Sequence, residues 1–158
     1  MAVKISKFLK PEHIKLELQC SERTDAIREV AEQLFEHHDV KDFETFYGEL
    51  LARERVESTC LGNEVAFPHA RTDAVSNMVL AIGRHPKGVW FENCNQNVRF
   101  LFVIGTPKRM VTDYLTVVGF LARLLRNTEF RETLSKTQSP QDFYNILTEA
   151  EANAGHLV

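Results

Sequence analysis

Five consecutive large apolar residues, Phe100-Leu101-Phe102-Val103-Ile104, constrain the fold more than any other segment of this chain. A strand with one face in water alternates apolar and polar residues, and this run has no polar position. The run is also far shorter than the roughly 20 apolar residues that a membrane-spanning helix needs. It therefore predicts a strand covered on both faces, which requires a sheet with helices on each side.

Helical periodicity lies on both sides of this strand in the sequence. Before it, Ser21 is a predicted N-cap for apolar positions spaced along 26–35, and a second helix begins near Asp42. After it, Ser139-Pro140 begins a final amphipathic helix, and Phe130 and Leu134 indicate a short one. The longest predicted helix has one apolar face made by Val111, Tyr114, Leu115, Val118, Leu121, Ala122 and Leu125.

Short apolar segments bounded by turn residues supply the other strands. They cover residues 14–18, 65–67, 78–83 and 89–91. Together these elements predict an α/β fold, a mixed β-sheet of about four to five strands sandwiched by α-helices. No linker or repeat divides the chain, so residues 1–158 are expected to form a single domain with an ordered core of about 5–150. The tail from Glu151 has little to bury and is expected to fray.

Composition excludes several classes of function. The 19 basic and 22 acidic residues leave a net charge of −3 with no block of one sign, which does not favour nucleic-acid binding. No segment predicts membrane insertion, and the N-terminus lacks a secretory signal. Cys20, Cys60 and Cys94 are far apart, so no disulfide framework is predicted, and Cys60 is interpreted as a small buried apolar residue. A reducing, cytoplasmic location fits this pattern.

Most of the six histidines have an ordinary interpretation. His37 and His38 are adjacent on a predicted helix and would point about 100° apart, so they are not expected to share a metal ion. His13, His85 and His156 lie among polar residues without zinc-site spacing, and all five are expected to face solvent. No metal or small cofactor is expected, since no glycine-rich phosphate loop or metalloprotease motif occurs.

His69 differs because Pro68 precedes it at the end of an apolar strand. Proline fixes its own φ and favours an extended residue before it, so the backbone that precedes His69 is rigid. A neutral imidazole is a nucleophile near neutral pH, and Arg53 and Arg71 are candidate cations for an anionic partner. The same pattern also fits a structural histidine at a strand end.

The residues around His69 resemble a known signature. Segment 53–71 contains Arg53-Glu54-Arg55, then Ser58-Thr59, then LGNEVAFPHAR over 61–71. This pattern is similar to the active-site signature of the type-2 EIIA domains, the fructose/mannitol/nitrogen-regulatory branch of the bacterial phosphoenolpyruvate-dependent phosphotransferase system (PTS). The order of strands and helices from about Ile5 to Ala150 agrees as well.

The resemblance implies a cytoplasmic phosphocarrier, a phosphotransferase with a phosphohistidine intermediate. His69 would accept a phosphoryl group from phospho-HPr, a small carrier protein, and pass it to an EIIB domain in sugar uptake. Arg53 would lie against the phosphoryl group, with Arg71 and Tyr114 as candidate lining residues. The stand-alone length resembles the nitrogen-regulatory members, so the alternative is a regulatory binding module whose partners depend on its phosphorylation. A copy that no longer accepts phosphate is a third hypothesis, against which the presence of both His69 and Arg53 argues.

Two positions depart from the family pattern. The family commonly has a histidine where Tyr114 stands, and a tyrosine, with a pKa of about 10, cannot become a cation near neutral pH. Its hydroxyl either donates one hydrogen bond to the phosphoryl group or belongs to a core-facing residue without a catalytic contact. Phe67 stands where an aliphatic residue is usual, which is expected to change packing but not chemistry.

Overall fold

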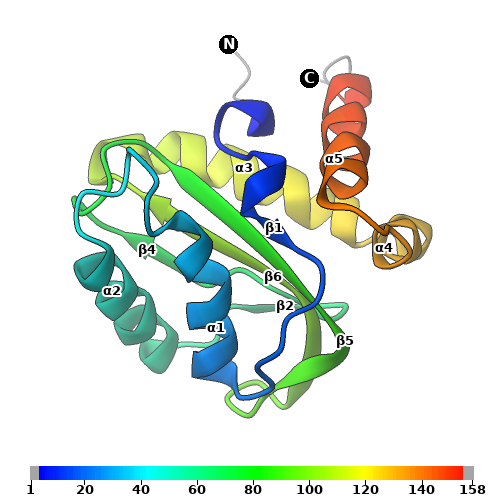
Figure 1. Cartoon of the computed structure of the whole chain (residues 1–158), viewed down its shortest axis with the longest axis horizontal. Coiled ribbons are helices and arrows are strands. Elements are labelled where there is room, and N and C mark those ends of the chain that lie inside the picture. Colours follow the sequence, from blue (N-terminus) through cyan, green and yellow to red (C-terminus); the bar gives the residue numbers. More distant parts are fainter. Residues whose placement is uncertain (1–3, 155–158) are drawn as a thin grey trace.

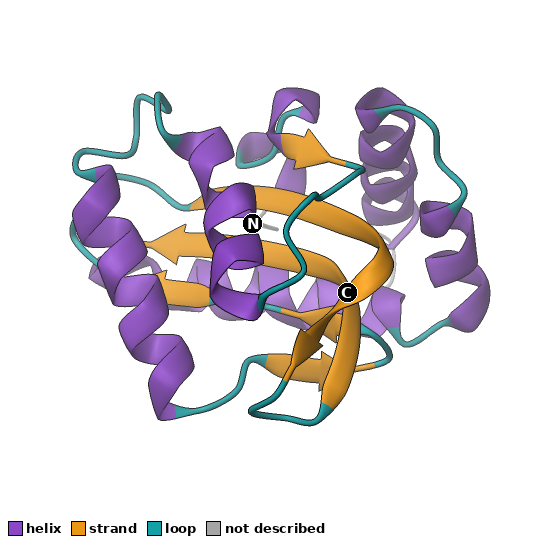
Figure 2. Ribbon diagram, turned by 60° about the horizontal axis from the view of Figure 1, so that its bottom comes forward, coloured by secondary structure: helices purple, strands orange, loops and turns teal. Residues whose placement is uncertain are grey.

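A six-stranded mixed sheet forms the middle layer of the computed structural model, which describes residues 4–154 (Figure 1). The strand order is β1-β5-β6-β3-β2, and β4 also pairs with β6. The long strands β5 (Val79–Phe91) and β6 (Gln96–Thr106) form an antiparallel hairpin that curves strongly in Figure 2. The short strands are β1 (Ile14–Lys15), β2 (Cys60–Gly62), β3 (Val65–Ala66) and β4 (His69–Arg71).

The expected doubly covered strand is the centre of β6. Successive side chains of a strand point to opposite faces, and here both faces are buried. Leu101 and Val103 are 0% exposed and belong to the apolar cluster under the first two helices. Phe100, Phe102 and Ile104 are also 0% exposed and belong to the cluster under the last three helices. The predicted α/β sandwich is therefore confirmed.

Helices cover the two faces in chain order. On one face lie α1 (Arg23–Ala31) and α2 (Phe43–Val56), in front of the sheet in Figure 1. The opposite face packs against α3 (Val111–Leu125), α4 (Thr128–Ser135) and α5 (Pro140–Ala154). Short 3₁₀ turns complete the chain: η1 (Ile5–Lys7), η2 (Pro11–His13), η3 (Glu32–Leu34) and η4 (Lys108–Met110).

Side-chain caps fix where the helices begin. Asp42 caps α2 as predicted, and its carboxylate accepts a hydrogen bond from the Thr45 backbone N–H. The prediction of Ser21 as the first cap is wrong by one residue. Glu22 occupies that position, where its carboxylate accepts from the backbone N–H groups of residues 24 and 25. An acidic side chain there also complements the helix dipole.

Several strand and helix details differ from the sequence predictions. Segments 78–83 and 89–91 belong to the single strand β5, which continues through a register shift between Arg84 and Val89. The predicted strand over 14–18 is reduced to the two residues of β1. Phe35, in the turn after η3, is 59% exposed and Leu115 on α3 is 62% exposed, although periodicity placed both in the core. The packing of neighbouring elements, not the local apolar spacing, sets these details.

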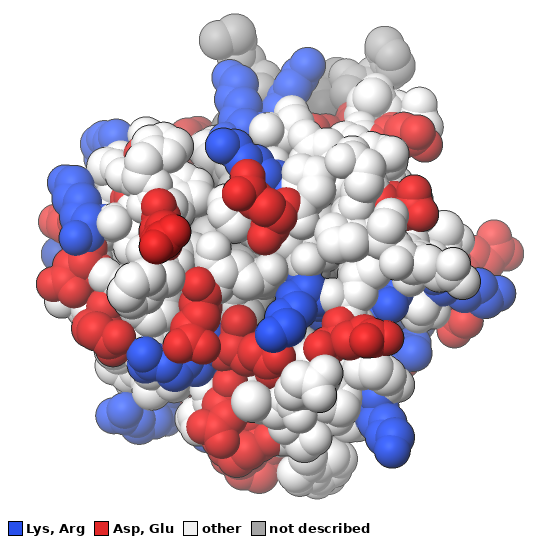
Figure 3. Space-filling model, viewed as in Figure 1, with Lys and Arg blue, Asp and Glu red and all other residues white. Residues whose placement is uncertain are grey.

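The chain end is more ordered than predicted. Helix α5 continues to Ala154, and the Glu151 carboxylate accepts a hydrogen bond from the Ile5 backbone N–H. This contact ties the last helix to the first turn, while residues 155–158 of the predicted frayed tail lie outside the described part. Among residues 4–154, no helix combines the length and apolar character that crossing a bilayer requires. Figure 3 shows acidic and basic side chains interspersed on the face viewed.

Candidate active site

A cavity of about 390 Å³ opens where β6 ends and α3 begins, and all four candidate site residues line it. Arg53 comes from the last turn of α2, His69 and Arg71 come from β4, and Tyr114 comes from the first turn of α3. Four further residues line the cavity that were not predicted as site residues: Glu49, Ala70, Thr106 and Val111. Glu49 precedes Arg53 by one helical turn, so helical spacing was the signal that could have identified it.

The backbone around His69 fixes the orientation and the proton of its imidazole. Strand β4 pairs in parallel with β6, and His69 lies opposite Ile104. The His69 Nδ1 atom is 2.8 Å from the Phe67 carbonyl oxygen. A carbonyl can only accept, so Nδ1 carries the proton and donates it. The neutral ring then keeps its lone pair on Nε2.

The surroundings of His69 favour the neutral imidazole. Burial lowers the pKa of His69, and the positive charge of Arg53 lowers it further. The hydrogen bond to the Phe67 carbonyl and the charge of Glu54 raise the pKa of His69, but the net shift is downward. His69 is therefore unprotonated at Nε2 near neutral pH, as a nucleophile must be.

Tyr114 lies against His69. The ring centroids are 5.2 Å apart with an interplanar angle of 37°, and Tyr114 also contacts the apolar cluster under α3. Burial raises the pKa of the Tyr114 hydroxyl, with Arg53 acting in the opposite direction. The phenol therefore keeps its proton near neutral pH and can donate one hydrogen bond into the cavity.

The two arginines provide positive charge at the cavity. Arg53 donates a hydrogen bond of 2.8 Å from one terminal nitrogen to the Glu57 carbonyl oxygen, which holds the guanidinium at the end of α2. Across residues 4–154, neither Arg53 nor Arg71 forms an ion pair with a carboxylate. Their remaining N–H groups suit the oxygens of a phosphoryl group.

The residue after Arg53 anchors the same helix end in the protein interior. Glu54 is 2% exposed, and its carboxylate is 3.2 Å from an Arg23 terminal nitrogen. It also accepts hydrogen bonds from the Thr59 hydroxyl at 2.6 Å and from the Asn93 amide at 3.0 Å. A buried carboxylate with this many partners holds the segments that donate to it in one arrangement.

The predictions for two cysteines are wrong. Cys60 and Cys94 form a disulfide, with Cα atoms 6.6 Å apart and a separation of 34 positions in the sequence. Cys60 is therefore not simply a small buried apolar residue. Cys20 is the free cysteine. Strand pairing within the sheet brings the two bonded positions together, and their separation in the sequence gave no signal of it.

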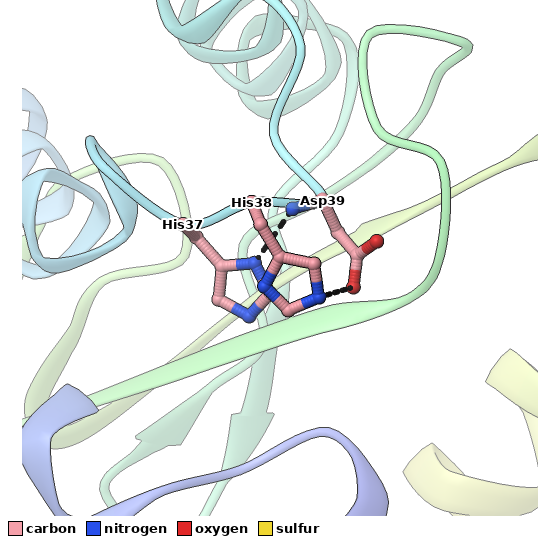
Figure 4. A group of neighbouring side chains, drawn as sticks. All are labelled: His37, His38 and Asp39. Carbon is pink, nitrogen blue, oxygen red and sulfur yellow. Dashed lines mark hydrogen bonds and ion pairs between the residues drawn. The ribbon is translucent and has the colours of Figure 1, made fainter.

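The predictions for the other histidines also need correction. His37 and His38 lie beyond the helix, and their rings stack with centroids 4.8 Å apart and an interplanar angle of 14° (Figure 4). His13 and His85 are each only 7% exposed, whereas His38 faces solvent as expected, and His156 lies outside the described residues. The sequence did not indicate that His13 and His85 are buried, because the residues around each of them are polar.

The ligand atoms of His37, His38 and Asp39 lie within 4.8 Å of one another. A metal ion lies in the plane of an imidazole that binds it, and two nearly parallel stacked rings do not share such a plane. The His37 Nδ1 atom also accepts a hydrogen bond of 3.0 Å from the Asp39 backbone N–H, which leaves the proton on Nε2 (Figure 4). Both rings would have to rotate before they could bind one ion together.

A family model and two relatives match this chain, and all three belong to the phosphoenolpyruvate-dependent sugar phosphotransferase system. Residues 7–150 match the family model described as "Phosphoenolpyruvate-dependent sugar phosphotransferase system, EIIA 2". The chain is 30% identical over 146 residues to the "PTS system fructose-specific EIIA component" of Haloferax volcanii, covering 92% of this chain and 95% of that protein. It matches only 23% of the longer "PTS system fructose-specific EIIABC component" of Bacillus subtilis, at 28% identity over 93% of this chain.

Solved structures show the same architecture. The nitrogen regulatory protein IIA-Ntr from Neisseria meningitidis superposes with a TM-score of 0.84 at 28% identity, covering 91% of this chain and 99% of that one. Enzyme IIAMTL, in its complex with phosphorylated enzyme IIBMTL from Escherichia coli, gives a TM-score of 0.77 at 25% identity, with 89% and 97% coverage. The fold is thus shared with a nitrogen regulatory protein and with an enzyme IIA that forms a complex with a phosphorylated enzyme IIB.

Proposed function

Because the chain belongs to the EIIA 2 family of the phosphoenolpyruvate-dependent sugar phosphotransferase system, its role is that of a phosphocarrier, and we propose that His69 is the residue that carries the phosphoryl group. The observation that carries this assignment is the hydrogen bond from His69 Nδ1 to the Phe67 carbonyl. It directs the nucleophilic lone pair to Nε2, while burial and the charge of Arg53 lower the pKa of His69 and keep the ring neutral.

In the proposed step, the lone pair of His69 Nε2 attacks the phosphorus of a phosphohistidine on a donor protein. The new Nε2–P bond forms as the donor's N–P bond breaks, and the departing donor imidazole keeps that electron pair. Positive charge develops on the His69 ring during this step. The Phe67 carbonyl, which accepts the Nδ1 proton, stabilises that charge.

The arginines stabilise the group in transit. A transferring phosphoryl carries negative charge on its three oxygens, so catalysis depends on position and on nearby cations rather than on acid–base steps. Arg53 is held by the Glu57 carbonyl and Arg71 follows His69 on β4. We assign the main electrostatic role to Arg53 because it bounds the same cavity from the helix side.

Tyr114 supplies a neutral donor beside the imidazole. Its ring is 5.2 Å from that of His69, and its hydroxyl remains protonated. One hydrogen bond to a charged phosphoryl oxygen is worth about tenfold or more in rate. A tyrosine adds no positive charge, so Arg53 carries a larger share of the stabilisation than it would beside a second cation.

The partners follow from this chemistry. The donor is an HPr-like phosphocarrier protein, and the acceptor is an EIIB domain, as in the Escherichia coli complex of enzyme IIAMTL with phosphorylated enzyme IIBMTL. Transfer between two histidines needs no metal or small cofactor. The reducing cytoplasm is the proposed location.

The test is phosphoryl acceptance by the purified chain. The protein is mixed with phosphoenolpyruvate, the first enzyme of the system and HPr, and its intact mass is followed with time. Wild type should gain one acid-labile phosphoryl group. His69→Ala should gain none, whereas His38→Ala, a change at an exposed histidine outside the cavity, should behave as wild type.

Two further variants test the roles of the lining residues. Arg53→Ala should slow acceptance by about 100-fold or more, the usual cost of removing a charged group from a phosphoryl or oxyanion site. Tyr114→Phe should slow it by about tenfold. Histidine phosphorylation that persists in His69→Ala would overturn the assignment.

The alternative is a regulatory module of the nitrogen-regulatory type. The observation favouring it is the likeness to IIA-Ntr from Neisseria meningitidis, which this chain matches over 99% of that protein's length. In that case the phosphoryl group on His69 would decide which protein is bound. Affinity capture with unmodified and phosphorylated chain should then retain different partners, and identical sets would contradict the regulatory role.

A further inference from the structure

The disulfide ties the active-site signature to a distant turn. Cys60 begins β2, directly after Ser58-Thr59, and Cys94 lies in the turn between β5 and β6. Both cysteines are half-buried, and the neighbours Glu92, Asn93 and Asn95 are exposed, so the turn side of this bond is accessible to a small thiol.

Each cysteine is adjacent to a residue that binds the Glu54 carboxylate. Thr59, next to Cys60, donates its hydroxyl at 2.6 Å. Asn93, next to Cys94, donates its amide to the carboxylate at 3.0 Å and to the Glu54 carbonyl at 3.4 Å. The disulfide therefore closes a ring of contacts around Glu54, the residue that follows Arg53 in α2.

A second path runs from the same position to the imidazole. The Phe67 backbone N–H donates a hydrogen bond of 3.0 Å to the Thr59 carbonyl. The Phe67 carbonyl in turn accepts the His69 Nδ1 proton at 2.8 Å. The backbone beside Cys60 is therefore two hydrogen bonds away from the group that sets the His69 tautomer.

We propose that Cys60 and Cys94 form a reversible thiol–disulfide site whose oxidised state holds Arg53 and His69 in position for phosphoryl transfer. This inference rests on the proposed function of His69. Two molecules of a thiol such as glutathione would reduce the bond, yielding the two cysteine thiols and one molecule of glutathione disulfide; the reverse reaction restores it. In a reducing compartment, disulfides are characteristically transient rather than structural.

Reduction acts by releasing the turn. Without the covalent bond, the turn at 91–95 is held to α2 by the contacts of Asn93 with Glu54 and to the start of α1 by the ion pair between Glu92 and Arg23. Weakening one hydrogen bond around Glu54 corresponds to about a fivefold change in the rate of phosphoryl acceptance. We therefore expect reduced protein to accept the phosphoryl group about fivefold more slowly than oxidised protein.

The test uses the whole chain equilibrated with glutathione and glutathione disulfide in varied ratio. Alkylation followed by peptide mass analysis reads the state of Cys60 and Cys94, and phosphoryl transfer from HPr is timed on the same samples. Cys20→Ser is the matched control, because it removes the free cysteine and should leave the redox dependence intact. The double variant Cys60→Ser/Cys94→Ser should accept at the slow rate in every buffer.

The imidazole signals provide a readout that a purely stabilising bond would not move. The NMR titration of His69 should differ between oxidised and reduced wild type, while that of exposed His38 should not. This comparison uses wild-type protein alone, so it does not depend on the folding of the double variant.

The outcomes separate the two proposals. Equal acceptance rates and an unchanged His69 titration in the two redox states would overturn the coupling. Free Cys60 and Cys94 thiols under the most oxidising ratio would overturn it as well. If neither redox state accepts from an active HPr, the proposed function fails, and the His69 titration alone then decides whether the disulfide acts on the site.

Discussion

Substitution of Glu54 tests how the buried carboxylate holds the end of α2. Two variants of similar size separate its charge from its hydrogen bonds. Glu54→Leu removes every acceptor, whereas Glu54→Gln keeps an oxygen and adds an amide donor. The three partners are the Arg23 guanidinium at 3.2 Å, the Thr59 hydroxyl at 2.6 Å and the Asn93 amide at 3.0 Å.

The expected magnitudes follow from what each variant leaves without a partner. In Glu54→Leu, the Thr59 hydroxyl loses its acceptor, the Asn93 amide keeps only the backbone carbonyl of position 54 at 3.4 Å, and Arg23 keeps only Glu92, at 2.9 Å. Breaking a buried pair in this way costs about 3–5 kcal/mol of the free energy of unfolding. In Glu54→Gln, the amide oxygen accepts from Arg23 and Asn93 while the amide nitrogen donates to the Thr59 oxygen. Only the charge is lost, which costs about 1–2 kcal/mol.

The free energy of unfolding is measured by urea titration followed by far-ultraviolet circular dichroism, with the disulfide kept oxidised. An unchanged slope with urea concentration shows that the midpoint reports stability. Equal losses in the two variants would refute the hydrogen-bond argument, because they would mean that the charge alone matters. A loss below about 1 kcal/mol in Glu54→Leu would show that the carboxylate does not hold this helix end.

The other stability predictions concern glycine and histidine positions. Gly83→Ala should lower the free energy of unfolding by about 1–3 kcal/mol, because a new Cβ would lie 2.4 Å from the Val30 Cγ2 atom. Gly48→Ala on α2 should raise it by about 0.5–1 kcal/mol, because its new Cβ would have no atom within 4 Å. Burial lowers the pKa of His13 and of His37 below the usual histidine value of about 6.5, so the unfolded chain binds protons first as the pH falls. Their contribution to stability is therefore full above that value and declines as the pH falls through their folded pKa values. Urea midpoints at about pH 7.5 and pH 5.5 should differ less in His13→Gln than in wild type, and an equal difference would contradict this attribution.

Local features of the sequence were sufficient for several parts of this structure. The apolar run 100–104 predicted a doubly buried strand because both of its faces are apolar, which requires cover on both sides whatever supplies it. Asp42 predicted the start of α2 because a cap acts on backbone groups only three residues away. Pro68 similarly predicted a rigid backbone before His69, since proline restricts its own backbone and that of the preceding residue.

Other features depended on contacts between distant parts of the chain. The apolar spacing of 111–125 predicted a helix but not its rotation, and Leu115 is exposed because α3 turns Tyr114 toward the cavity and Val117 toward the core. Glu49 reached the cavity for the same reason: the position of α2 against β4 decides which of its faces meets His69.

The sequence by itself determined the layered architecture, the start of α2 at Asp42 and the rigid backbone before His69, because each depends on residues within a few positions of one another. Only the tertiary structure decided the pairing of Cys60 with Cys94, the burial of His13 and the set of partners around Glu54. These depend on segments far apart in the sequence, as the 34-residue separation of the two cysteines and the 39-residue separation of Asn93 from Glu54 illustrate. Packing of the whole sheet fixes such contacts, and no local pattern encodes them.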